Sequence, residues 1–345
     1  MLRVGWSQRR HPVAPRQEGC GKFFKTCARL LRVDDGDPST RCTGPGGTRE
    51  IRTLWEMPEV LEVPVEGMDG RRWVKLLSIN PGGIAGGSGL QYFTGEFDGV
   101  TFRAQGAAGP EAPLQDHQWV DYGADFYAAT TISGAPGGKP VLFGWMGNWD
   151  YAQKMPTTPW RRAMAIPREL TLSGGSSNGN DDGGRPAWRS SIASVPAGVL
   201  SSGAASERQL TVADESKPLG EDFSSRSRLL DVELTPDGAA EAGIELRGPK
   251  IRYQAQSGAL TVDRSAAGTS DFSDKFSPYH EVSVPLADEK LKLRLLIATS
   301  SVVVFRPRKR HCCHRSPPAD WSNTDTSVFS EGGKTGFTLT GRKLA

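Results

Sequence analysis

The chain has 345 residues, of which 37% are hydrophobic and 23% charged, enough apolar material for one large domain or two ordinary ones. Its 42 lysines and arginines nearly balance 39 aspartates and glutamates, which argues against a protein that binds polyanions over its whole surface. No stretch approaches the roughly 18 consecutive apolar residues of a membrane-spanning helix, so we expect no transmembrane protein.

Cysteine usage argues against a scaffold held by disulfides. The five cysteines lie near the two ends of the sequence, at Cys20, Cys27, Cys42, Cys312 and Cys313. The main body therefore has none to pair. The first residues lack the apolar stretch of a secretory signal, so the sequence leaves the compartment of the protein open.

The first half of the chain is predicted to be a leader followed by a β domain. Residues 1–51 show no periodic run and are interpreted as a disordered or mis-specified leader. Residues 52–172 carry short aromatic and β-branched runs between turn residues, a pattern typical of propeller blades or a sandwich. The expected strands are Trp73–Ile79, Leu90–Phe97, Phe126–Ile132, Val141–Trp145 and Arg162–Leu172. Asp98-Gly99 indicates a hairpin.

The second half is predicted to be a second β domain behind a linker. Residues 173–189 are rich in Gly, Ser, Asn and Asp and favour a flexible connection. Residues 190–345 resume strand patterns and are assigned to a β-sandwich. The expected strands are Arg228–Leu234, Gly243–Arg247, Ile251–Ala255, Ala259–Asp263, Leu291–Ile297 and Ser301–Phe305.

Glu56 is the first candidate for chemistry. It lies between Trp55 and the pair Met57-Pro58. An apolar, partly desolvating setting raises the pKa of a carboxyl group and suits a general acid, and a proline restricts the local backbone. The alternative is a glutamate at a strand end in solvent.

Several segments in the right order resemble glycoside hydrolase family 32, the levanase-, inulinase- and invertase-like β-fructofuranosidases. They are Trp55-Glu56-Met57-Pro58, Ser78 to Gly83, Gly89 to Gly99, Asp121 to Ala128, Gly144 to Tyr151, Pro159 to Arg161, Pro167 to Leu170, Asp263 to Ser265, Ser300 to Phe305 and, more faintly, Phe329 to Gly333. The first resembles the family's Trp-Glu-Cys-Pro box, with Met57 in place of cysteine.

The resemblance implies an all-β fold, a partial five-bladed β-propeller followed by a β-sandwich. It implies a retaining mechanism with two carboxylates, in which Glu56 matches the acid/base. Asp121 matches a sugar-contacting position and Trp145 an aromatic residue of the pocket, where a ring packs on a sugar; Asp125 is a further substrate-binding candidate. Each of these residues also has a purely structural alternative. Asp121 could be a turn aspartate, Trp145 a tryptophan of the blade core, and Asp125 the acceptor of a structural hydrogen bond. We expect Trp149 and Trp160 to be core residues.

The sequence departs from the family at the attacking carboxylate. Neither an Asn-Asp-Pro box nor an Arg-Asp-Pro box is present. The nearest imitation, Gly36-Asp37-Pro38, lies too close to Glu56 and is rejected. We therefore expect an N-terminally incomplete relative of impaired activity, because covalent catalysis lacks its first step.

Two other functions stay open. One is a carbohydrate-binding remnant without catalysis. The other is a zinc or nucleic-acid site in the basic run 306–315, whose adjacent cysteines lack the usual ligand spacing; a sequence artefact there is the simpler interpretation. The predicted partner is a fructan or sucrose-type carbohydrate. We expect no metal, cofactor, nucleic-acid or membrane partner, and the oligomeric state is open.

Overall fold

The computed structural model describes residues 54–67, 69–109, 112–132, 134–135, 138–157, 163–173, 204–306, 309–314 and 325–344. Apart from short 3-10 turns, among them η1 (Leu114–Asp116) and η3 (Glu221–Phe223), the regular structure in these ranges is strand, which confirms the all-β prediction. Within the same ranges, no helix has the length and apolar character to cross a membrane. The predicted leader 1–51 and nearly all of the linker 173–189 lie outside them.

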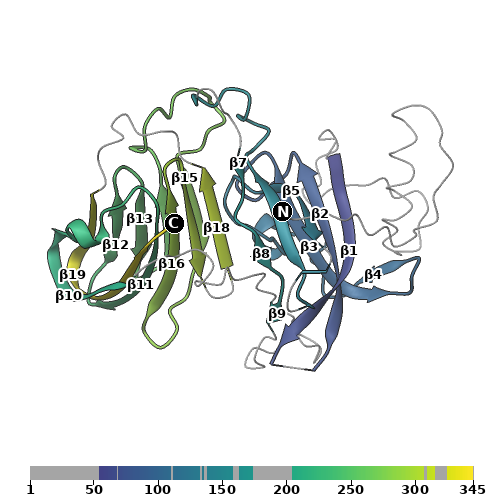
Figure 1. Cartoon of the computed structure of the whole chain (residues 1–345), viewed down its shortest axis with the longest axis horizontal. Helices are drawn as coiled ribbons and strands as arrows, with labels where there is room; N and C mark the ends of the chain where they lie inside the picture. The colour runs from purple at the N-terminus through teal and green to yellow at the C-terminus, as the bar shows by residue number, and fades with distance from the viewer. Residues whose placement is uncertain are drawn as a thin grey trace.

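The N-terminal module contains two sheets, drawn in purple to teal in Figure 1. The first has the order β4-β3-β2-β1-β9 and the second the order β5-β6-β7, with β8 also pairing β6. The strands are β1 (Leu54–Glu66), β2 (Arg71–Asn80), β3 (Gly89–Phe97), β4 (Phe102–Ala104), β5 (Tyr127–Ile132), β6 (Val141–Met146), β7 (Ala163–Met164), β8 (Arg168–Glu169) and β9 (Leu172–Ser173).

Strand β1 carries a bulge at the sequence motif. Glu56 pairs with Ser78, but Glu59 pairs with Leu76, so the register shifts between them. Met57 has a φ of 49° in the left-handed region. A bulge tolerates proline because the ladder is already interrupted there, which explains how this strand accommodates the Met57-Pro58 pair. Glu56 is thus the last regularly paired residue before the bulge at Met57-Pro58.

The hairpin predicted at Asp98-Gly99 is present, but its loop covers residues 98–101 rather than the two residues expected. The prediction of one strand over Arg162–Leu172 is wrong. Asp98 caps the β3–β4 turn by accepting the backbone N–H groups of Val100 and Thr101 at 2.9 and 2.7 Å. The later segment forms three two-residue strands, because β7 and β8 pair with β6 whereas β9 pairs with β1. The chain there crosses from one sheet to the other, so a long ladder cannot form.

The C-terminal module is one long sheet that folds over itself, drawn in green to yellow in Figure 1. Its strands are β10 (Ser206–Pro218), β11 (Arg228–Asp237), β12 (Glu241–Leu246), β13 (Lys250–Gln254), β14 (Ala259–Asp263), β15 (Tyr279–Ser283), β16 (Leu291–Ala298), β17 (Ser301–Arg306), β18 (Lys309–His314) and β19 (Thr326–Lys343). The first part of β19 pairs with β12 and the second part with β11.

The fold-over lies at a bend shared by β10 and β19. Gly332 and Gly333 have φ values of 72° and 150°, and Asp214 on β10 accepts both of their N–H groups, at 2.6 and 3.2 Å. A Cβ on Gly333 would lie 2.4 Å from the backbone carbon of Gly238. The bend brings the two halves of the sheet together around a shared apolar core, which is the sandwich arrangement.

Replacing Gly333 by Ala should therefore lower the free energy of unfolding by about 1–3 kcal/mol, because the methyl group meets backbone and the φ value disfavours an L residue. Gly336→Ala is the matched control on the same strand, since a Cβ there meets nothing within 4 Å. Urea unfolding followed by circular dichroism measures both. Equal losses in the two variants would show that the bend does not require glycine.

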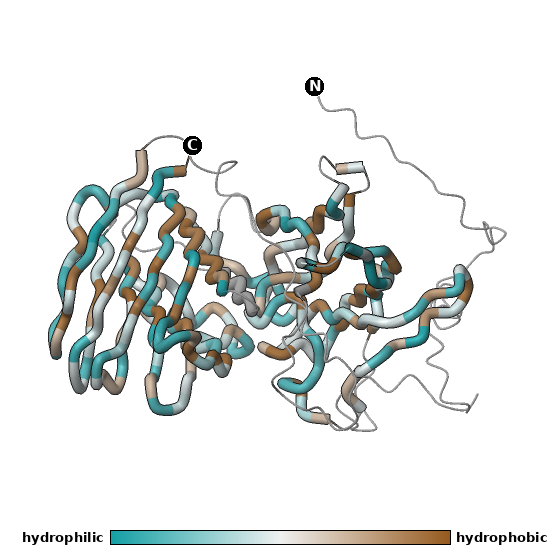
Figure 2. Tube along the Cα trace, turned by 90° about the horizontal axis from the view of Figure 1, so that it is seen from below, coloured by the Kyte–Doolittle hydropathy of each residue, from teal (hydrophilic) through white to brown (hydrophobic). Residues whose placement is uncertain are grey.

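A second core joins the two modules. It contains residues of β1, β2, β3 and β6 together with Leu229, Leu296, Val303 and Phe305 of the C-terminal module. Strand β16 shows how one strand serves both cores. Its residues Leu291, Leu293 and Leu295 point into the sandwich core. On the opposite face Lys292 and Arg294 are charged, but the next residue on that face, Leu296, is apolar because it packs against the N-terminal module. Figure 2 shows hydrophobic and hydrophilic residues alternating along the strands of the C-terminal module, on the left of that view.

The basic run 306–315 contains β18, which pairs antiparallel with β17 so that Cys312 lies opposite Val303. The backbone of this segment is thus an edge strand of the sandwich. Its side chains, together with residues 307–308 and 315–324, lie outside the description, so the zinc and nucleic-acid alternatives stay untested. The strands that were not among those expected from the sequence are β1, β4, β10, β15, β18 and β19.

Candidate functional site

Glu56 directly precedes the bulge of β1 and is exposed. The desolvation expected from its apolar neighbours is therefore not provided by the fold. What the fold provides is a fixed partner: the hydroxyl of Tyr127, at the start of β5, donates a hydrogen bond to the Glu56 Oε2 atom. A strand from the second sheet thus holds one oxygen of a carboxylate on the first sheet, and the carboxylate stays accessible.

Tyr127 is suited to remain a donor. Its residue is 1% exposed, and burial, followed by the hydrogen bond and charge of Glu56, raises the pKa of its hydroxyl well above the usual range. The phenol consequently stays protonated and able to donate at neutral pH. Nearby, Glu59 on β1 accepts a hydrogen bond of 2.9 Å from the backbone N–H of Thr131, which lies on β5 with Tyr127. This contact further fixes β1 against β5.

Two tryptophans continue the site beyond Tyr127. The Trp145 ring on β6 packs edge-on against Tyr127, with centroids 6.2 Å apart, and Trp149 packs against Trp145 at 5.0 Å. Trp145 is half-buried. Trp149 is 42% exposed, so its assignment to the core was wrong. Trp160, also assigned to the core, lies outside the residues that the structure describes. A Cβ on Gly147 would lie 2.5 Å from the Trp145 ring, so the close approach of this ring requires glycine.

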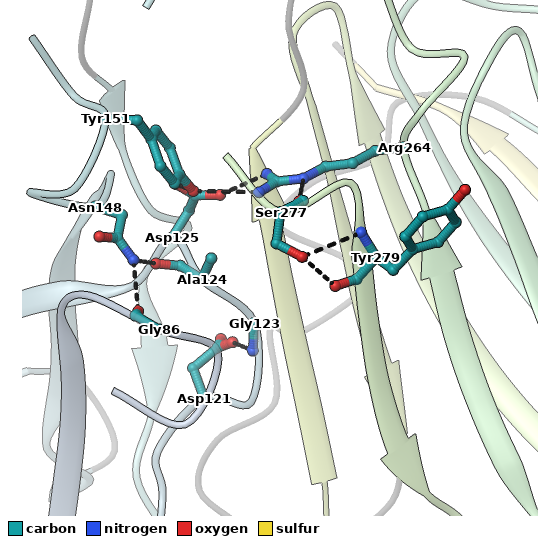
Figure 3. Close-up of polar contacts among 10 residues, drawn as sticks. All are labelled: Gly86, Asp121, Gly123, Ala124, Asp125, Asn148, Tyr151, Arg264, Ser277 and Tyr279. Atoms are coloured by element: carbon teal, nitrogen blue, oxygen red, sulfur yellow. Dashed lines mark hydrogen bonds and ion pairs between the residues drawn. The ribbon is translucent and has the colours of Figure 1, made fainter. Parts of the chain in front are cut away.

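Asn148 ties the tryptophan loop to its surroundings. Its Nδ2 atom donates to the carbonyl oxygens of Gly86 at 3.0 Å and Ala124 at 2.9 Å (Figure 3). Its Oδ1 atom accepts the N–H of Ser88 at 3.2 Å, and the Ser88 hydroxyl accepts the N–H of Trp149 at 3.0 Å. Three loops are thereby joined at the end of the module that carries the aromatic side chains.

Asp121 is held in a buried ion pair. Its Oδ2 atom lies 2.7 Å from an Arg168 nitrogen, with both side chains 1% exposed. Its Oδ1 atom accepts the N–H of Gly123 at 2.8 Å, as a turn aspartate does. The Arg168 guanidinium stacks on the Phe126 ring at 3.9 Å and lies 5.8 Å from Phe305 of the C-terminal module. This places Asp121 at the module boundary.

Asp125 makes a second buried ion pair across the boundary. Its Oδ2 atom is 3.1 Å from Arg264, which follows β14 in the C-terminal module, and the side chains are 0% and 1% exposed. The Tyr151 hydroxyl donates to the Asp125 Oδ1 atom at 2.6 Å. Figure 3 shows these contacts between the two modules.

Of the four residues predicted from the sequence, the structure connects Glu56 and Trp145, through Tyr127. Asp121 and Asp125 lie in ion pairs instead. Sequence reasoning did not select Tyr127 and placed Trp149 in the core. In the described part of the chain, no group of three or more His, Cys, Asp or Glu side chains could hold a metal ion.

Comparisons with known proteins match both modules. The family model "Glycosyl hydrolases family 32 N-terminal domain" matches residues 40–181, and "Glycosyl hydrolases family 32 C terminal" matches residues 199–340. Levanase of Bacillus subtilis is 34% identical over 267 residues, which cover 73% of this chain and 37% of levanase. Extracellular exo-inulinase of Aspergillus awamori is 33% identical over 266 residues, covering 73% and 47%.

Solved structures show the same fold. The crystal structure of exo-inulinase from Aspergillus awamori matches with a TM-score of 0.71 at 27% identity, covering 84% of this chain and 57% of that chain. β-Fructofuranosidase from Schwanniomyces occidentalis, complexed with fructosyl-erythritol, matches with a TM-score of 0.68 at 20% identity, covering 84% and 60%. These matches confirm the predicted fold, β-propeller followed by β-sandwich. The chain spans about a third of the length of Bacillus subtilis levanase and about half of that of Aspergillus awamori exo-inulinase.

Proposed function

This chain belongs to glycosyl hydrolases family 32, and we propose that it acts on terminal β-D-fructofuranosides of the levan, inulin or sucrose type, with Glu56 as the group that protonates the departing oxygen. The relatives that support the substrate class carry the names levanase and exo-inulinase. The observation that supports the residue is the exposed Glu56 carboxylate, fixed by Tyr127 beside an aromatic wall.

The arrangement suits one half of a retaining mechanism. In such a mechanism an attacking carboxylate displaces the leaving group while a second one protonates the leaving oxygen and later activates water. With one oxygen of Glu56 occupied by the Tyr127 hydroxyl, the other is left to carry the transferred proton. Trp145 and the exposed Trp149 offer ring faces on which the C–H groups of a sugar can pack.

Within the described residues, the structure places no second carboxylate beside Glu56 that we can assign to the attacking role. The 345 residues contain no Asn-Asp-Pro segment. Asp121 and Asp125 are 3% and 0% exposed and bound to arginines, so neither is placed to attack a sugar. Their direct contact with substrate stays a prediction, against which this burial argues. We infer that this chain turns over slowly.

An external nucleophile tests this proposal directly. Azide can attack the anomeric carbon of the fructosyl group while Glu56 donates its proton to the leaving oxygen, which gives fructosyl azide and the free alcohol. We expect cleavage of sucrose or inulin oligosaccharides to rise in proportion to azide concentration, measured by chromatography of the products. Binding of the oligosaccharide without cleavage at any azide concentration would instead favour the carbohydrate-binding remnant.

A further inference from the structure

The boundary between the two modules contains a buried polar network centred on Arg264. Besides the ion pair with Asp125, its Nε atom donates to the carbonyl oxygen of Ser277 at 2.9 Å, and its guanidinium stacks on the Phe276 ring at 3.8 Å. A terminal nitrogen also lies 3.4 Å from the Tyr151 hydroxyl. The C-terminal module thus holds the guanidinium in a fixed orientation and presents it to the N-terminal module (Figure 3).

This network reaches both segments that form the candidate site. Asp125 lies two residues before Tyr127, the partner of Glu56. Tyr151, which donates to Asp125, lies two residues after Trp149. One guanidinium therefore fixes two chain segments at once, one leading to the carboxylate partner and the other to the exposed ring.

An ion pair at this position is not explained by stability alone. Removing two charges from water costs several kcal/mol, and apolar residues of similar volume often stabilise a protein equally well. A guanidinium with directed hydrogen bonds differs from an apolar contact in that it fixes orientation. Burial, and then the charge of Asp125, raise the pKa of Tyr151 well above its usual value, so its hydroxyl remains a donor and the network stays closed.

We propose that Arg264 is a positioning residue of the fructoside site: through Asp125 and Tyr151 the C-terminal module sets the place of Trp149 and Tyr127. The sandwich is then a working part of the site rather than a separate attachment. The role in catalysis rests on the proposed function, whereas the positioning itself can be measured on the free chain.

Fluorine NMR of the full chain labelled with 5-fluorotryptophan tests the positioning without any substrate. The sequence has nine tryptophans, and loss of one signal in Trp149→Phe identifies the Trp149 resonance. We expect Arg264→Met to move this resonance by more than its line width toward its position in the denatured chain. The signal of Trp73, which packs on Phe97 and is assigned in the same way with Trp73→Phe, should keep its position. Tyr151→Phe, which removes only the hydroxyl, should move the Trp149 resonance in the same direction by less.

The matched control is Arg252→Met. Arg252 pairs with Asp263 at 3.1 Å on the C-terminal module and is 30% exposed, so the same charge is lost one strand away. We expect no movement of the Trp149 signal in this control. If Arg264→Met does not fold, Tyr151→Phe decides alone. An unmoved Trp149 resonance in every folded variant of the network would overturn the proposal.

A binding measurement separates this proposal from the proposed function. Titration with an inulin oligosaccharide should show roughly threefold to tenfold weaker binding in Arg264→Met than in the unaltered chain, the range expected when a ring contact is misplaced. If the unaltered chain binds no oligosaccharide, the proposed function fails. The fluorine spectra still decide whether Arg264 positions the loop.

Discussion

Replacing Asp121 by Asn should lower the free energy of unfolding by about 3–5 kcal/mol, the cost of leaving one partner of a buried ion pair uncompensated. The Arg168 guanidinium is 1% exposed, and Asp121 holds it at 2.7 Å. Its Nε and Nη1 atoms have no hydrogen-bond partner in the described part of the chain. An amide in place of the carboxylate therefore leaves the Arg168 cation buried without an opposite charge. No other hydrogen-bond acceptor in the described residues offsets that loss at its Nε and Nη1 atoms.

Urea unfolding of Asp121→Asn and Asp231→Asn measures the difference. Asp231 pairs with Arg294 and Arg342 on the sandwich with its side chain 30% exposed, where an ion pair contributes about 0–1 kcal/mol. The double variant Asp121→Asn with Arg168→Met should recover part of the loss, because Met keeps contact with Phe126 and removes the orphaned charge. Equal losses at Asp121 and Asp231 would show that the buried pair has no special role.

Replacing Glu56 by Gln should lower the rate of sucrose cleavage in the presence of azide by about 10²–10⁴-fold, the usual contribution of a positioned general acid. Glutamine keeps the shape and can still accept the Tyr127 hydroxyl, but it has no proton to donate to a leaving oxygen. The loss should therefore appear in kcat rather than in the affinity for the oligosaccharide.

Glu62→Gln is the matched control for this substitution. Glu62 is exposed on the same strand as Glu56, and its replacement removes an equal charge. The Glu62→Gln variant should therefore cleave sucrose at the rate of the unaltered chain. Circular dichroism establishes that both variants are folded. A comparable loss of rate in the control would assign the effect to charge on β1 rather than to proton transfer.

The sequence predicted strands well where burial alternates regularly and poorly where the chain changes partner. Leu291–Ile297 alternates because one face lines the sandwich core, and it forms β16. Strand β19 was missed because Gly332-Gly333 resembles a turn, whereas here it bends one continuous strand between two sheet partners. The segment 162–172 was predicted as one strand because its apolar pattern does not encode the crossing between sheets.

The site could be predicted from sequence only where a short motif marks it. Glu56 stands out because four consecutive residues resemble a family box. The partners that fix the site are distant along the chain: Tyr127 lies 71 positions from Glu56, and Arg264 lies 139 positions from Asp125. Tyr127, at the start of β5, and Arg264, just after β14, both lie in segments that resemble the family, but nothing in those segments marks either residue as a partner of the site until the fold places it.

Leaving-group dependence is the most direct test of whether Glu56 donates a proton. The leaving group of a nitrophenyl fructoside is a stable nitrophenolate, which needs little protonation as it departs. The glucose of sucrose leaves only if its oxygen receives a proton. In azide, Glu56→Gln should therefore impair cleavage of sucrose strongly and leave the nitrophenyl substrate nearly unaffected. An equal loss with both substrates would contradict proton donation by Glu56 and, with it, the function proposed for this chain.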